Sequence, residues 1–148
     1  MNDEIRSFVE RINDAAGFEL DVTVDEGDGE EAFRVVLSGP DRGLLLGRGA
    51  ELLDAIEYVT NRAFGKRMGH DEKIVFDSGN YRALRANELR MMAEKAAERV
   101  RSSHSAFTFE PMTPSERRII HLALVEDGTV RTESIGDGFD RKVKVLPA

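Results

Sequence analysis

Two glycines flank an arginine at Gly47-Arg48-Gly49-Ala50, between a short apolar segment and the start of a predicted helix. Glycine permits a sharp turn and lets another backbone come close, because it carries no Cβ atom. The N-terminus of the following helix offers N–H groups and a partial positive charge, and Arg48 adds a full charge. These features predict a clamp for a backbone phosphate. An ordinary turn between two helices is the alternative, and the glycines alone favour it.

A second candidate site lies in the segment Glu116-Arg117-Arg118-Ile119-Ile120-His121. Arg117 and His121 are four residues apart and therefore share one face of a helix. A cation and an imidazole on one exposed face can hold a phosphate and stack against or hydrogen-bond a base. The alternative is an ordinary amphipathic helix, with Arg117 in solvent and His121 hydrogen-bonded at a domain edge. Spacing alone favours that alternative.

The formal net charge of −7 argues superficially against a nucleic-acid partner. The charge is unevenly distributed, however. Residues 1–57 hold fifteen acidic and five basic side chains, whereas residues 58–148 hold thirteen acidic and sixteen basic ones. The net charge of the whole chain therefore does not decide the partner.

Several classes of chemistry are excluded by composition. The chain has no cysteine, which removes disulfides, thiolate catalysis and Cys-ligated metals, and its three histidines, at 70, 104 and 121, are scattered. No motif of a catalytic triad or a metalloprotease is present, so we expect no enzyme activity, cofactor or metal. No apolar run could span a membrane, and the acidic N-terminus lacks an export signal, so a cytoplasmic location is expected.

The elements that must position both segments follow from the spacing of apolar residues. This spacing predicts helices over about 3–16, 50–64, 80–101 and 114–126, and strands over about 18–24, 33–37, 73–77, 107–109, 129–135 and 140–146. A short apolar helix is also expected at about 41–46, directly before the glycines. Asn2 or Asp3 is expected to cap the first helix. Thr113 is expected to cap the helix that carries the second site, with Pro114 in its first turn.

The order of these elements predicts an α+β protein of two small domains. Ser78-Gly79-Asn80 is the best candidate boundary. The first half then reads α-β-β-α-α-β and the second reads α-β-α-β-β. Each half would bury a modest core by packing helices on one face of a small sheet.

Both motifs, in this order, resemble those of a known family. The stretch from Gly43 to Tyr58 is similar to the loop of a type II KH domain, and Pro111 to Leu124 closely resembles the signature of an R-three-H domain, named for its Arg-x-x-x-His. Together they resemble the bacterial Jag (KhpB/EloR) family, also called SpoIIIJ-associated proteins. The resemblance implies a KH domain at 1–78 and an R-three-H domain at 79–148.

The resemblance also implies a function. It implies non-catalytic binding of single-stranded RNA, with DNA as an alternative ligand, and a role in regulating cell-envelope growth. A small KH-domain protein or a second copy of the chain is the implied protein partner. The implied nucleic-acid-binding residues are Gly47, Arg48, Gly49, Ala50, Arg117, Arg118 and His121.

Two departures from the family pattern bear on that function. Ala50 stands where the family loop usually has glycine, and its methyl group could crowd a sugar-phosphate or cost about 1 kcal/mol in a left-handed conformation. A rival hypothesis is therefore a protein-interaction regulator, whose altered loop dimerises or docks a partner instead of binding RNA. Many members also begin with an additional N-terminal domain, which we expect to be missing here.

Overall fold

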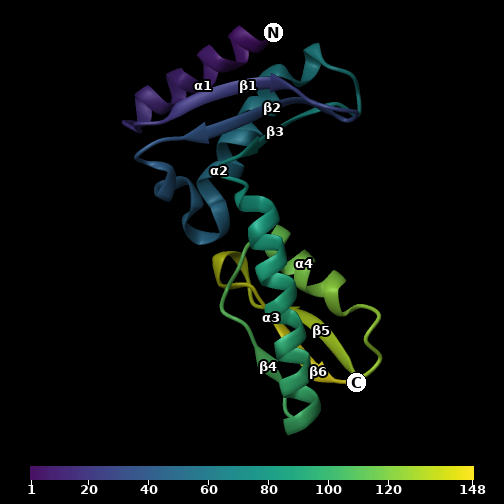
Figure 1. Cartoon of the computed structure of the whole chain (residues 1–148). Coiled ribbons are helices and arrows are strands. Elements are labelled where there is room, and N and C mark those ends of the chain that lie inside the picture. Colours follow the sequence, from purple (N-terminus) through teal and green to yellow (C-terminus); the bar gives the residue numbers. More distant parts are fainter. The chain divides into compact units, whose positions relative to one another are not determined.

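The computed structural model describes residues 1–148, which form two compact units, Met1–Arg82 and Ala83–Ala148 (Figure 1). Each unit contains one three-stranded sheet with helices packed on one of its faces. The α+β fold class predicted from the sequence is confirmed. No helix is both long enough and apolar enough to cross a membrane.

The first unit contains two helices, three strands and the start of a third helix. These are α1 (Asn2–Ala16), β1 (Asp21–Glu26), β2 (Glu31–Ser38), α2 (Arg42–Phe64), β3 (Lys73–Asp77) and the first residues of α3 (Tyr81–Ser103). The strand order is β1-β2-β3, with β1 antiparallel and β3 parallel to the central strand. The predicted side-chain cap on α1 is wrong, because Met1 occupies the N-cap position and makes no such bond.

The core of the first unit follows from the alternation of apolar residues in its strands. Val24 lies opposite Val35, and Val35 lies opposite Phe76, so one row of buried side chains crosses all three strands. Ile5 and Val9 of α1 belong to the same buried cluster. Burial of each such side chain stabilises the fold by about 2 kcal/mol relative to full exposure.

Helix α2 is two helices joined at the glycine-rich segment. Gly47 is extended, with a ψ of 150°, and Arg48, Gly49 and Ala50 follow with positive φ angles of 55°, 68° and 63°. Left-handed residues cannot continue a right-handed helix, so the chain turns here before the second helical stretch. The break places these four residues at the start of that stretch, as the sequence predicts.

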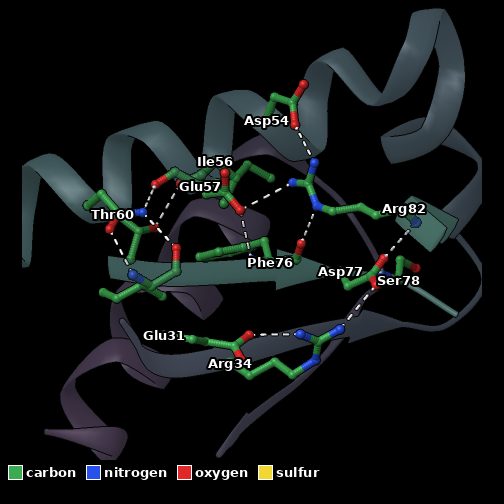
Figure 2. A network of polar contacts seen from close by, with 12 residues as sticks. Glu31, Arg34, Asp54, Ile56, Glu57, Thr60, Phe76, Asp77, Ser78 and Arg82 are labelled. Carbon is green, nitrogen blue, oxygen red and sulfur yellow. Dashed lines mark hydrogen bonds and ion pairs between the residues drawn. The ribbon is translucent and has the colours of Figure 1, made fainter. Parts of the chain in front are cut away.

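Side chains of α2 and Arg82 cover the outer edge of β3 (Figure 2). Asn61 binds both backbone groups of Ile74: its Nδ2 donates to the carbonyl at 2.8 Å, and its Oδ1 accepts from the N–H at 2.9 Å. Phe76 N–H donates to Glu57 Oε2 at 2.8 Å, and Arg82 Nε donates to the Phe76 carbonyl at 2.6 Å. Burial raises the pKa of the Glu57 carboxyl, against the opposing effects of the Phe76 N–H and Arg82. The backbone groups of this edge strand are therefore satisfied without a further strand.

Buried polar groups order the segment that leads from β3 into α3 (Figure 2). Asp77 Oδ1 accepts from the backbone N–H groups of Ser78 and Arg82, at 2.8 and 3.3 Å, while Arg34 binds Oδ2. Arg42 Nε donates to Ser78 Oγ at 2.9 Å. These contacts keep residues 77–82 within the first unit. The division after Arg82 thus falls inside α3, a few residues beyond the predicted boundary.

The second unit contains most of α3, one further short helix and three strands, of which the last in sequence is the central strand of the sheet. After α3 come β4 (Phe107–Thr108), α4 (Pro114–Leu124), β5 (Val130–Ile135) and β6 (Lys142–Pro147), with an antiparallel strand order of β4-β6-β5. The predicted start of α4 is confirmed, because Thr113 Oγ1 accepts from Glu116 N–H at 3.3 Å and Pro114 is the first helical residue.

An ion pair with a buried carboxylate joins α3 to α4 inside the second unit. Glu116 is only 5% exposed, and both Nε and Nη2 of Arg85 donate to its Oε2, at 3.1 and 2.9 Å. A buried carboxylate needs such a partner, because removing one member of a buried pair leaves an uncompensated charge.

Replacing Arg85 with alanine should therefore destabilise this unit. We expect Arg85→Ala to lower the free energy of unfolding by about 3 kcal/mol, measured by urea denaturation followed by circular dichroism. Arg90, on the same helix, bonds only to the exposed Asn87, so Arg90→Ala should change stability by less than about 0.5 kcal/mol. Equal losses in both variants would contradict this account of the pair.

Candidate functional site

Two hydroxyl groups of β5 hold the imidazole of His121. Its Nδ1 lies 2.6 Å from Thr132 Oγ1, and its Nε2 lies 2.9 Å from Ser134 Oγ. Both ring nitrogens therefore have partners within the protein. In this respect the structure matches the alternative interpretation of His121 as a hydrogen-bonded residue.

The surroundings of His121 keep its ring neutral. Burial lowers the pKa of this imidazole, and the positive charge of Arg117 lowers it further. A neutral imidazole has one N–H donor and one acceptor nitrogen. The ring therefore donates to one of the two hydroxyls and accepts from the other.

Arg117 lies one turn before His121 on α4 and has no anionic partner. The side chain is half-buried, its Nε atom is buried without a hydrogen-bond partner, and no carboxylate lies within ion-pair distance. The adjacent carboxylate, Glu116, is bound by Arg85 instead. This guanidinium is therefore a partly desolvated cation, and its planar set of N–H donors suits a phosphate.

Arg118 lies apart from this pair in spite of its position in the sequence. Successive residues of a helix are rotated by about 100°, and both Arg118 and Leu122 are on the exposed side of α4. The structure therefore brings together Arg117 and His121 and directs Arg118 elsewhere.

Thr132 and Ser134 were not predicted from the sequence as residues of this site. Both side chains lie on the buried face of the sheet. Thr132 is opposite Val145 of β6 and Ser134 is opposite Val143, and both valines are buried. The alternation within the predicted strand at 129–135 could have placed the two hydroxyls on one face. It could not have shown that His121 binds them, because that contact depends on how α4 packs.

The predicted phosphate loop has one exposed cation and one buried residue. The Arg48 side chain is 71% exposed, and its Nε lies 3.5 Å from Glu51 Oε2. Ala50 is only 2% exposed and belongs to the core of the first unit. Its methyl group therefore packs inward and does not obstruct a phosphate from outside, in contrast to the crowding considered from the sequence.

Apolar side chains are exposed on α2 on both sides of the break. Leu44 precedes the break, and Tyr58, which is 65% exposed, and Val59 follow it. Together with Arg48 and Glu51, they give this part of α2 a mixed apolar and charged surface. Such a surface suits a protein contact as well as a nucleic acid.

The lowered pKa of His121 predicts a pH-dependent stability. The unfolded chain takes up the proton near the ordinary pKa of 6.5, whereas the folded ring resists protonation. The unit Ala83–Ala148 should therefore be most stable above this pH and lose stability as the pH falls below it. Urea midpoints of α4, followed by amide NMR signals at pH 7.5 and about 5.5, measure the loss. His121→Gln should reduce this pH dependence, and an unchanged dependence would refute the assignment.

Comparisons with known proteins agree with the R-three-H motif. Residues 87–147 match the R-three-H domain family. The chain is 33% identical over 137 residues to the RNA-binding protein KhpB of Clostridium symbiosum, an alignment that covers 93% of this chain and 62% of the relative. The present chain therefore spans about three-fifths of the length of that relative.

Two further relatives bear the same name. The RNA-binding protein KhpB of Bacillus subtilis (strain 168) is 30% identical over 144 residues, which cover 96% of this chain and 68% of the relative. The KhpB protein of Lactiplantibacillus plantarum is 29% identical over 104 residues, which cover 70% of this chain and 32% of the relative. These similarities over most of the chain, together with the R-three-H match, show that the chain belongs to the KhpB (Jag) family.

Proposed function

We propose that this chain is a non-catalytic protein that binds single-stranded RNA and that Arg117 is its main phosphate contact. The observation that carries the proposal is the half-buried Arg117 guanidinium, which has no carboxylate partner and lies one turn from a neutral His121. A bound phosphate would supply the missing charge and accept its N–H groups. The names of the KhpB relatives support RNA as the ligand.

The small size of this site favours an unpaired strand. The Arg117 face offers one guanidinium beside an imidazole and two hydroxyls, and Arg118 points away from it. A duplex is held through many phosphates along its grooves, whereas a flexible single strand can present one phosphate together with an accessible base.

The rest of the assignment follows the family. We assign residues 1–78 to a KH domain and 79–148 to an R-three-H domain, with Gly47, Arg48, Gly49 and Ala50 as a second phosphate contact. We further propose that the protein acts in the cytoplasm, in RNA-level regulation of cell-envelope growth. A small KH-domain protein or a second copy is the proposed protein partner. Sequencing of RNA crosslinked to the protein in cells would test the pathway.

Removing Arg117 should weaken RNA binding and its dependence on salt. For a labelled mixed-sequence RNA oligomer, measured by fluorescence anisotropy, we expect Arg117→Ala to lower the affinity about tenfold, or ~1.4 kcal/mol. The slope of log affinity against log salt should fall by about 0.7, the value for one phosphate contact of a single strand.

Arg90→Ala is the matched control, because it removes the same charge from an exposed position on α3. It should leave the affinity and the salt slope almost unchanged. The absence of binding by the original chain at low salt would refute the proposal, as would equal affinities of the two variants. Binding of a DNA oligomer of the same sequence measures the preference for RNA.

A second candidate function for the first unit is protein docking. The observation that favours it is that Leu44, Tyr58 and Val59 of α2 are exposed, while Arg48 of the loop already lies near Glu51. On this hypothesis the loop contacts a second copy or a small partner protein rather than RNA.

Charge reversal at the loop distinguishes the two functions of this unit. If the loop contacts RNA, Arg48→Glu should weaken binding several-fold and reduce the salt slope, whereas the uncharged Tyr58→Ser should not alter that slope. If the surface docks a protein, Arg48→Glu should leave the RNA salt slope unchanged. In that case Tyr58→Ser should weaken self-association, measured by sedimentation after nuclease treatment.

A further inference from the structure

We propose that Thr132 and Ser134 supply a direct phosphate contact at the Arg117 site, and that His121 is a positioning residue that orients their hydroxyl groups. The inference rests on the proposed function and deepens it. Its basis is the pair of contacts that the ring nitrogens make with the two hydroxyls, 2.6 and 2.9 Å long. On this account His121 acts through β5 and does not itself touch the RNA.

The hydrogen-bonding capacity of the three groups leads to this inference. If Nδ1 carries the proton, the ring donates to Thr132 and accepts from Ser134, so the Thr132 hydroxyl retains a proton to donate. If Nε2 carries it, the Ser134 hydroxyl retains that proton. Neither hydroxyl has another hydrogen-bond partner in the structure. In both tautomers, therefore, one oriented O–H donor of this pair is available to a ligand.

The imidazole ring of His121 has no free hydrogen-bonding nitrogen of its own. Both of its nitrogens are occupied, so a direct bond from His121 to a phosphate would first require one of the two hydroxyl contacts to break. A ligand that binds a hydroxyl instead leaves both contacts in place. The existing geometry thus favours contact through Thr132 or Ser134 over contact through the imidazole.

The Arg117 guanidinium indicates which class of ligand this site suits. Arg117 can only donate hydrogen bonds, and its buried Nε lacks a partner. A guanidinium one turn before His121 and a hydroxyl donor held by the His121 ring together suit a ligand that carries several acceptor oxygens and a negative charge. A phosphodiester of the nucleic-acid backbone meets both requirements.

Thr132 and Ser134 are also held rigidly, which a contact residue requires. They lie on consecutive inward positions of β5, where Thr132 is opposite Val145 and Ser134 is opposite Val143. Both residues are half-buried, and the β6 partners of both are fully buried. An oriented hydroxyl binds an anion more effectively than a mobile surface hydroxyl, because less conformational freedom is lost.

A mutant cycle on the full chain tests the proposal with the same labelled RNA oligomer. The double variant Thr132→Val, Ser134→Ala should bind about tenfold more weakly, with an unchanged salt slope because no charge is removed. His121→Ala should cause a similar loss. Adding His121→Ala to the double variant should cause no further loss, because a positioning residue has no effect once the groups it positions are absent.

Two conservative variants separate a lost contact from damaged folding. Thr132→Ser keeps the hydroxyl and should retain affinity, and Thr132→Val is nearly isosteric with the original residue. Circular dichroism and urea denaturation show which variants remain folded, and the ¹⁵N signals of the His121 ring report its tautomer. In the original chain these signals should stay those of a neutral, hydrogen-bonded ring when RNA is added.

Three outcomes would overturn the proposal. The folded double variant could bind as tightly as the original chain, the triple variant could bind more weakly than the double, or the ring signals could show a contact with RNA. In each of these cases the original chain still binds RNA with a salt slope that depends on Arg117, so the proposed function stands. Absence of RNA binding by the original chain refutes the function itself.

Discussion

The pairing of Arg85 with Glu116 is the interaction on which the candidate site depends. Glu116 is the carboxylate closest in sequence to Arg117, and it is buried where an unpaired charge would be strongly unfavourable. Arg85 neutralises it from α3 and fixes the first turn of α4 at the same time. Arg117 is consequently left as a cation with no internal partner, although it follows an acidic residue directly. Because Arg85 neutralises Glu116, the neighbouring Arg117 keeps a charge that no carboxylate of the protein compensates.

Local pairing of charges, rather than the net charge, determines what each unit can bind. The unit Met1–Arg82 has eighteen acidic and ten basic side chains, whereas Ala83–Ala148 has ten acidic and eleven basic ones. Within the acidic unit Arg82 binds both Asp54 and Glu57, so part of its negative charge is already compensated. The net charge of −7 describes neither surface, since the field at a site is set by the charges around it.

The sequence predicted those features that depend on local spacing. Helix and strand positions followed from apolar periodicity, and Thr113 with Pro114 marked the start of α4 because capping acts within one turn. Contacts between distant segments could not be predicted in this way. Arg85 pairs with Glu116 across 31 residues, and His121 binds hydroxyls 11 and 13 residues away. The inward direction of the Ala50 methyl likewise depends on the left-handed loop and not on composition.

The covered edge of β3 has a consequence for how the first unit can assemble. An incoming strand can extend a sheet only if it finds free backbone donors and acceptors. At Ile74 and Phe76 those groups already bind Asn61, Glu57 and Arg82, so an added strand would have to displace three side chains and expose the half-buried carboxylate of Glu57. Growth of this sheet by a second molecule is thereby favoured at the side of β1, so edge-to-edge polymerisation through both sides is disfavoured.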